Sequence, residues 1–253
     1  MTPSETPALS CSRDEAGPVG WRPPSAPGHR LGHPHGSGQA DLYGRALLSR
    51  LHEGGSTESG WRVRDGDGVV RSLDAALDRW LGSCDAADRT VLDRCTGATL
   101  DVGCGPGRLV AERRTPGVLS VGIDVNDVAV QITRDRGGAA VRADVFGPVL
   151  EQIHWDTLVL LDGNLGIGGD PARLFGRCAE LLGPGGELVV ETEAPGCGRG
   201  RGRRRLENTS EVGQWFPWAT LDADGVTAYA APASLVLRET WSVENRWFAA
   251  LTA

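Results

Sequence analysis

Short runs of apolar residues alternate with amphipathic segments from about residue 88 to the C-terminus. The apolar runs predict strands and the segments between them predict helices. The predicted strands are Thr99–Val102, Ser120–Asp124, Ala139–Ala143, Thr157–Leu161 and Glu187–Glu191, and the predicted helices are Arg108–Arg113, Asp127–Arg136 and Pro171–Leu182. Near the C-terminus, Leu235–Trp241 and Trp247–Leu251 predict an antiparallel hairpin. This alternation is typical of a parallel sheet built from βα units, so we expect an α/β fold with an open sheet.

The first 87 residues show a different pattern. Residues 1–40 are rich in Pro, Gly and Ser and predict a disordered tail, because they offer little apolar surface to bury. Residues 41–87 predict a small cap with a helix over Asp41–Leu51, a hairpin over Trp61–Val70 and a second helix capped by Ser72. We therefore expect a tail, a cap and a main domain over residues 88–253.

Composition and charge disfavour several classes of protein. The 253 residues carry a formal charge of −7, whereas a general nucleic-acid or membrane-surface binder is basic. No apolar run approaches the ~20 residues that cross a bilayer. The six cysteines lack metal-ligand spacing, which favours a reduced, cytoplasmic protein. In the tail, His29, His33 and His35 have no further candidate ligands nearby, so no metal site is predicted.

The strongest chemical signal is LDVGCGPG, in which a predicted strand runs directly into Gly103, Gly105 and Gly107 before a predicted helix. Glycines let the backbone turn sharply and approach a ligand closely, and the first N–H groups of a helix favour an anionic group. Asp101, at the end of the strand, adds an acceptor for an amino group. Cys104 is interpreted as a small packing residue. The order GxGxG differs from the GxGxxG of nicotinamide-binding proteins.

The next two predicted strands also end in acids. Asp124 ends the segment VGID and suits ribose hydroxyls, and Asp144 ends the segment VRAD and suits the exocyclic amine of adenine. Acids at three successive strand ends indicate a ligand made of a nucleoside and an amino-acid tail.

These motifs resemble the class I S-adenosylmethionine-dependent methyltransferase family. The likeness covers residues 92–253 and includes LDVGCGPG, GIDVN, RADVF, WDTLVLLDGN and LLGPGGELVVE. The resemblance implies a Rossmann-like open sheet of about seven strands, mostly parallel with a reversed last strand, and helices on both faces. It also implies S-adenosylmethionine as cofactor, with the methionine moiety near residues 101–107. The expected cofactor-binding residues are Asp101, Gly103, Cys104, Gly105, Gly107, Asp124, Val125, Asp144, Val145 and Asp162.

The segment LDGNLGIGGD follows the fourth strand, where the resembled family places the methyl acceptor. Asp162 and Asn164 are the candidate catalytic residues, for positioning the acceptor or accepting its proton; alternatively, this segment only caps the next helix. Relatives that methylate base amino groups often carry Asn or Asp, two prolines and an aromatic residue here, and this chain does not. His154 precedes the strand, at the end distant from the cofactor, and His52 reaches the site only if the cap folds over it.

Two further segments bear on the acceptor. The arginine-rich Gly196–Arg205 is either a solvated loop or a loop that recruits an anionic acceptor. The aromatic segment Trp215–Trp218 is also expected in a loop, where it packs against the C-terminal hairpin or lines the acceptor pocket.

The sequence favours an enzyme that transfers a methyl group to a small molecule, which the arginines suggest is anionic. Two alternatives stay open. One is a methyltransferase acting on protein or nucleic acid, with the arginine-rich segment as docking patch, and the other is a binding protein without turnover. No nucleic-acid or membrane partner is expected.

Overall fold

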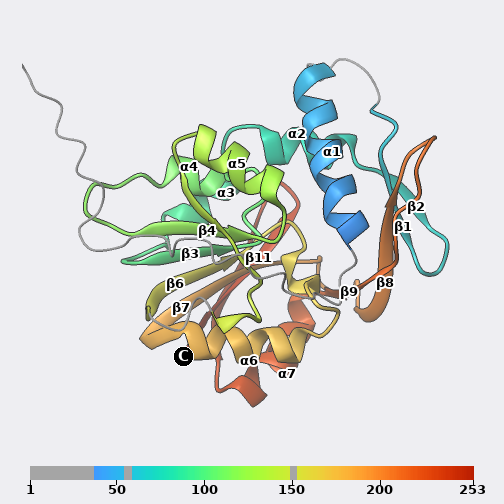
Figure 1. Ribbon diagram of the computed structural model, residues 1–253. Helices are drawn as coiled ribbons and strands as arrows, with labels where there is room; N and C mark the ends of the chain where they lie inside the picture. Colours follow the sequence, from blue (N-terminus) through green and yellow to red (C-terminus); the bar gives the residue numbers. More distant parts are fainter. Residues whose placement is uncertain (1–36, 54–58, 149–152) are drawn as a thin grey trace, which may run out of the picture.

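A seven-stranded sheet forms the centre of the protein in the computed structural model, which describes residues 37–53, 59–148 and 153–253 (Figure 1). The strand order is β10-β11-β7-β6-β3-β4-β5. The strands are β3 (Thr99–Val102), β4 (Ser120–Asp124), β5 (Ala139–Arg142), β6 (Trp155–Leu160), β7 (Leu182–Thr192), β10 (Val236–Val243) and β11 (Arg246–Thr252). Strand β11 is antiparallel to both β7 and β10, whereas the pairs from β7 to β5 are parallel. The prediction of a mostly parallel sheet with a reversed last strand is confirmed.

Helices cover both faces of this sheet (Figure 1). One face carries α3 (Ala86–Leu92), α4 (Arg108–Glu112) and α5 (Asp127–Asp135), and the other carries α6 (Pro171–Leu181) and α7 (Val226–Ala230). Alternate residues of β6 supply the two cores: Leu158 and Leu160 pack with Phe175 of α6, and Val159 packs with Val91 of α3. Because both faces are buried, the central strands are mostly apolar and are readily predicted from the sequence.

A second sheet of four strands joins segments from two distant parts of the chain. Its order is β2-β1-β8-β9, with β1 (Arg62–Asp65), β2 (Val70–Ser72), β8 (Arg199–Glu207) and β9 (Phe216–Leu221). The expected N-terminal hairpin is therefore present. The arginine-rich segment, however, is strand β8 and not a loop, because it pairs with β1 on one side and β9 on the other. The aromatic segment likewise lies mostly within strand β9.

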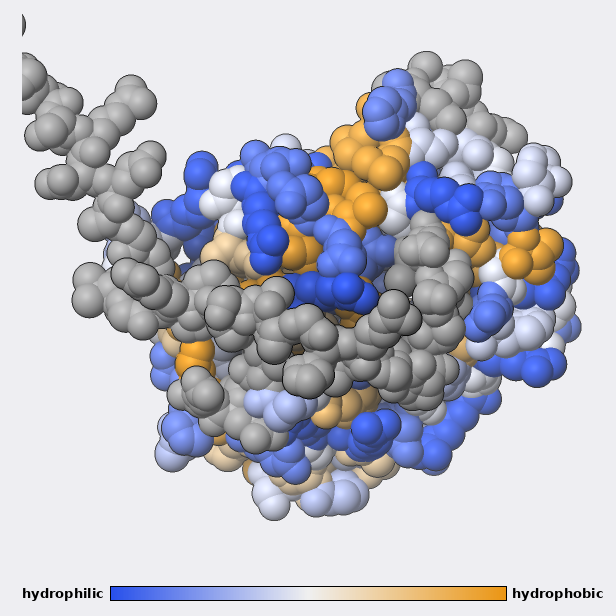
Figure 2. Space-filling model, viewed as in Figure 1, coloured by the Kyte–Doolittle hydropathy of each residue, from blue (hydrophilic) through white to orange (hydrophobic). Residues whose placement is uncertain are grey.

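Helix α1 (Ser37–Glu53) lies between the second sheet and the main domain, and α2 (Asp74–Leu81) packs beside it. Leu42 and Leu47 of α1 share a core with Leu77 of α2 and Leu206 of β8. Apolar surface remains visible next to α1 (Figure 2), where Leu48 and Leu51 are partly exposed.

The predicted cap of α2 is wrong in detail. The residue at the N-cap position is Leu73, although the Ser72 hydroxyl still accepts a hydrogen bond from the backbone N–H of Asp74 at 3.1 Å. The three histidines of the tail lie outside the described residues. Short 3₁₀ turns complete the fold: η2 (Asn164–Gly166), η3 (Ala223–Gly225) and η4 (Ala231–Ala233). Within the described ranges, no helix is long and apolar enough to cross a membrane, and no group of side chains is suited to hold a metal ion.

Candidate active site

The glycine loop connects β3 to α4 at the carboxyl edge of the main sheet. Gly103, Gly105 and Gly107 all have positive φ angles, of 72°, 54° and 75°, which L-residues with side chains rarely adopt. A Cβ on Gly107 would lie 2.3 Å from Cγ2 of Thr133 in α5, so only glycine lets the loop and the helix approach this closely. The three glycines are thus required by the backbone, as the sequence indicated.

Two polar side chains hold the glycine loop from either side. The Thr133 hydroxyl donates to the carbonyl of Gly105 at 2.9 Å. The amide nitrogen of Asn164, at the start of η2, donates to the carbonyls of Val102 and Gly103 at 3.0 and 2.9 Å. Asn164 was predicted as a catalytic candidate on the acceptor side. The structure uses its amide to fix the loop, so we treat it as a positioning residue.

Asp101 is a buried carboxylic acid without a partner. Its side chain lies at the end of β3 and the residue is only 6% exposed. Among the described residues, no hydrogen bond or ion pair reaches it. Burial raises the pKa of Asp101 to about 7, and nearby Arg108 opposes that rise. An unpaired carboxyl group at this position is suited to receive an amino group from a ligand.

Asp124, at the end of β4, lies directly beside the glycine loop. Its two carboxylate oxygens accept hydrogen bonds from the backbone N–H groups of Gly105 (3.0 Å) and Asn126 (2.8 Å). Burial raises the pKa of Asp124 to about 6, although these backbone hydrogen bonds favour its ionised form. A carboxylate offers about four acceptor positions, so Asp124 can still accept from a ligand hydroxyl beside its backbone donors.

The remaining predicted cofactor residues lie around the same edge. Asp144 follows β5, and its carboxylate accepts from the N–H of Phe146 at 3.0 Å. Val125 is 49% exposed beside Asp124, whereas Val145 is 3% exposed and packs in the main core. Cys104 is buried in a small cluster with Val110 and Val130, which supports its interpretation as a packing residue.

Asp162 lies in a network of ion pairs after β6. Its oxygens accept from Nε of Arg79 (2.9 Å) and Nη1 of Arg108 (2.5 Å), while its backbone N–H donates to Glu191 (2.7 Å). Its φ angle of 56° is unusual for a residue with a side chain, and these contacts hold it there. Two guanidinium groups thus already occupy both of its carboxylate oxygens. The arrangement therefore favours a positioning role for Asp162 over that of a general base.

Three residues at this site were not identified from the sequence. Arg108 follows the last glycine of the loop, is 4% exposed at its side chain, and pairs with Asp88 as well as Asp162. Arg79 reaches Asp162 from α2. The hydroxyl of Tyr43, from α1, lies 3.0 Å from the position that a Cβ on Gly105 would occupy.

Tyr43 reaches the loop because α1 packs closely on the start of α5. A Cβ on Gly44 would lie 2.9 Å from Cγ2 of Val128, and the Tyr43 ring meets Trp80 of α2 edge to face. Burial and the neighbouring charges of Asp124 and Asp162 raise the pKa of Tyr43 well above its usual value, so the phenol stays protonated. No local pattern in α1 signals this contact, which depends on the long-range docking of the helix.

The second sheet borders the site through β9. Trp218 forms a β-bridge with Ile167, and its indole packs against Gly166. The segment after β6 is rich in glycine because its backbone comes close to neighbouring residues there. Trp218 of the aromatic segment therefore packs against η2 and the residue after it, while Trp241 and Phe248 of the C-terminal hairpin stack on each other. The histidines named above are not at the site: His52 is exposed near the far end of α1, and His154 precedes β6.

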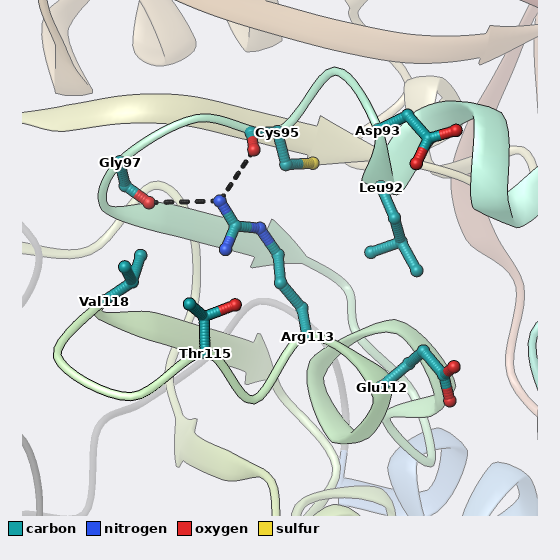
Figure 3. Close-up of a pocket in the computed structure, with 8 residues that line it drawn as sticks. All are labelled: Leu92, Asp93, Cys95, Gly97, Glu112, Arg113, Thr115 and Val118. Carbon is teal, nitrogen blue, oxygen red and sulfur yellow. Dashed lines mark hydrogen bonds between the residues drawn. The ribbon is translucent and has the colours of Figure 1, made fainter.

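A surface depression of about 360 Å³ lies at the opposite edge of the main sheet (Figure 3). Arg113 crosses it and donates to the carbonyls of Cys95 and Gly97 at 2.8 and 3.3 Å. It adjoins the segments that lead into β3 and β4, away from Asp101 and the glycine loop. Ligands of open α/β sheets bind outside the carboxyl ends of the strands, so we do not assign this depression to the active site.

Comparisons with known proteins agree with this geometry. Residues 100–190 match the family model described as a methyltransferase domain. A ubiquinone biosynthesis O-methyltransferase from Saccharophagus degradans is 29% identical over 100 residues, which are 37% of this chain and 42% of that protein. The chain thus matches about two fifths of the length of this curated relative.

Solved structures share the fold. A methyltransferase from Bacteroides fragilis, in complex with S-adenosylhomocysteine, superposes with a TM-score of 0.73 at 21% identity, over 87% of this chain and 97% of that one. The sugar N-methyltransferase KedS8 from Streptoalloteichus gives a TM-score of 0.52 at 17% identity, over 74% and 94% of the two chains.

The matched domain, the sheet order and the glycine loop agree with the resemblance seen in the sequence. Residues 100–190 match a methyltransferase domain, and the fold is the one found in S-adenosylmethionine-dependent methyltransferases.

Proposed function

We propose that the protein is an enzyme that binds S-adenosylmethionine at the carboxyl edge of the main sheet and methylates a small molecule. The observation that carries the cofactor assignment is Asp101, a 94% buried carboxyl group without a partner among the described residues. An ammonium group of the bound ligand offsets the free-energy cost of burying this unpaired acid. The remaining acceptor positions of Asp124 suit the ribose, and Asp144 and Val125 border the adenine position.

The residues at this site act by positioning. Bound S-adenosylmethionine supplies a methyl group on a positively charged sulfur, which a nucleophile displaces in line. Asn164 and Thr133 fix the glycine loop, and Tyr43 covers it and excludes water. Holding two reactants in the correct geometry can contribute ~7–11 kcal/mol to catalysis, so methyl transfer does not require a catalytic triad.

Three observations support a small acceptor. The matching relative is named for the biosynthesis of a small molecule, ubiquinone. The formal charge of −7 disfavours nucleic acid. The segment after β6 lacks the Asn/Asp-Pro-Pro-aromatic pattern of base methylation.

If the acceptor is anionic, Arg204 is its expected partner on β8, through the guanidinium nitrogens other than Nε, which donates to Asp65 at 2.8 Å. Strand alternation puts Arg204 on the face that carries Trp218 and Leu206, next to η2 and α1. Arg203 and Arg205 point to the other face, where both lie over Trp215. We therefore expect R204Q to raise the acceptor KM, and R203Q, its neighbour on the opposite face, to leave that KM unchanged.

Calorimetric titration with S-adenosylmethionine and S-adenosylhomocysteine tests the cofactor assignment. We expect the wild-type protein to bind with micromolar affinity. D124A should bind at least about tenfold more weakly, because charge-assisted hydrogen bonds to the ligand are missing. D127A should keep the wild-type affinity, because its side chain is 71% exposed on the first turn of α5. The labelled methyl donor is then offered with small-molecule and protein acceptors. Absence of binding by folded protein contradicts the cofactor assignment, and transfer only to proteins contradicts the small-molecule assignment.

A further inference from the structure

Arg136, the C-cap residue of α5, is a half-buried cation that donates to backbone carbonyl groups. Its Nη1 donates to the carbonyl of Pro106 at 3.0 Å and to that of Trp80 at 3.4 Å, and its Nη2 donates to the carbonyl of Leu81. Among the described residues no acidic side chain pairs with it, and burial together with the charge of Arg108 lowers its pKa. The three carbonyls therefore replace the water that burial removes.

These carbonyls belong to two separate parts of the protein. Pro106 is in the glycine loop, whereas Trp80 and Leu81 are the last two residues of α2. Helix α2 is part of the N-terminal block, which consists of α1, β1, β2 and α2. Carbonyls at the end of a helix lack partners within the helix and carry the negative end of its dipole, so a cation is favoured there. One guanidinium thus joins the glycine loop to the N-terminal block.

Helix α5 holds two successive carbonyls of the glycine loop. Thr133, three residues before Arg136, donates to the carbonyl of Gly105, and Arg136 donates to the next one. At its other contact, Arg136 holds α2, where the Trp80 ring meets Tyr43 edge to face. The Tyr43 hydroxyl itself lies beside Gly105. The position of α2 therefore bears on the loop and on the phenol that covers it.

We propose that Arg136 is a positioning residue for the cofactor: it ties α2 to the glycine loop, so that the docking of α2 and the affinity for S-adenosylmethionine depend on each other. This inference rests on the proposed function. Such a dependence is reciprocal. If docked α2 favours the loop conformation that binds the cofactor, bound cofactor must in turn favour docked α2.

Calorimetry and hydrogen–deuterium exchange measure the two sides of this dependence. We would titrate the wild-type protein and R136Q with S-adenosylmethionine, and follow amide exchange of residues 74–81 with and without S-adenosylhomocysteine. R136Q should bind S-adenosylmethionine about 5- to 50-fold more weakly, because charge-assisted hydrogen bonds that hold the loop are missing. Without ligand, α2 should exchange faster in R136Q than in the wild type. S-adenosylhomocysteine should slow this exchange more in the wild type than in R136Q.

Two further variants separate this role from a general loss of stability. Arg134, on the same helix, donates from Nε and Nη2 to the carbonyl of Ala140 at 3.0 and 2.9 Å, away from the loop and α2. R134Q should therefore leave the affinity and the exchange of α2 unchanged. R136K keeps a cation that can donate to carbonyls, but without the planar fork of a guanidinium. It should recover part of the lost affinity, and it covers the case in which R136Q does not fold.

The outcomes are distinct. Unchanged affinity and unchanged α2 exchange in folded R136Q would overturn the inference and leave the proposed function intact. Weaker binding without faster exchange of α2 would also overturn it, because Arg136 would then act on the loop alone. An equal loss of affinity in R134Q would mean that destabilisation of α5 is the cause, and the inference would be wrong. Failure of the folded wild-type protein to bind S-adenosylmethionine at all would refute the proposed function and this inference together.

Discussion

Replacing Asp101 by Asn should make the ligand-free protein more stable at neutral and alkaline pH while removing its affinity for S-adenosylmethionine. The substitution keeps the shape of the side chain and removes its ability to ionise. Burial holds the pKa of Asp101 at about 7 in the folded protein, against an ordinary value of 3.8. Each pKa unit corresponds to ~1.4 kcal/mol, so ionised Asp101 lowers the free energy of unfolding by up to ~4 kcal/mol.

The sign of the pH dependence follows from the raised pKa. Between pH 4 and 7 the folded protein keeps the Asp101 proton that the unfolded chain has already released, so stability falls as pH rises through this range. Above about pH 7 both states have lost the proton and the penalty is constant. The advantage of D101N should therefore grow from ~1.5 kcal/mol at pH 5 to ~4 kcal/mol at pH 8.

Urea unfolding of both proteins at pH 5, 6, 7 and 8, followed by circular dichroism, measures this difference directly. Asp124 also has a raised pKa, but it is present in both proteins and cancels. The reasoning would be refuted if D101N gained stability by the same amount at every pH, or if D101N were less stable than the wild type. Calorimetry completes the experiment: wild-type affinity for S-adenosylmethionine should fall as pH drops below about 7, when the acid binds a proton instead of the ligand ammonium.

Three further predictions concern the support of the site. G107A should lower the free energy of unfolding by clearly more than G117A in thermal or urea melts, because both glycines have positive φ but only at Gly107 would a Cβ meet another residue. N164A removes the donor to two loop carbonyls and should cost about 1–3 kcal/mol in the same measurement and weaken cofactor binding. R108Q should cost about 3–5 kcal/mol because it removes the buried guanidinium that pairs with both Asp88 and Asp162, whereas R201Q, with a 57% exposed side chain, should change stability by less than about 1 kcal/mol.

The main domain was predictable because its signals are local. Buried parallel strands are mostly apolar, and Gly103, Gly105 and Gly107 mark a backbone conformation that few other residues adopt. Asp101 and Asp124 were placed at strand ends by counting from those glycines, and the structure brings both to one edge of the sheet. These features depend on short-range geometry, which the order of residues specifies.

The second sheet was not predictable in the same way. Strand β8 contains five arginines and only one buried apolar side chain, so its hydrophobic pattern does not indicate a strand. It becomes one because β1 and β9 supply hydrogen-bonding partners and Arg64 and Arg205 pair with Glu207. Tyr43 and Arg79 were missed for a related reason: their positions depend on how α1 and α2 dock onto a distant part of the chain.

The pairing of β1 with β8 also has a consequence for how the active site forms. Arg64 of β1 and Glu207 of β8 form an ion pair although they are 143 positions apart in the chain. A loop this long closes late in folding, because its two ends must first meet. The central sheet can form before this contact, but Tyr43 reaches the glycine loop and Arg79 reaches Asp162 only once the N-terminal block is anchored. We therefore expect the chain to become able to hold a ligand late in folding, because a chain that has folded only its central sheet lacks the contacts that the N-terminal block makes with Gly105 and Asp162.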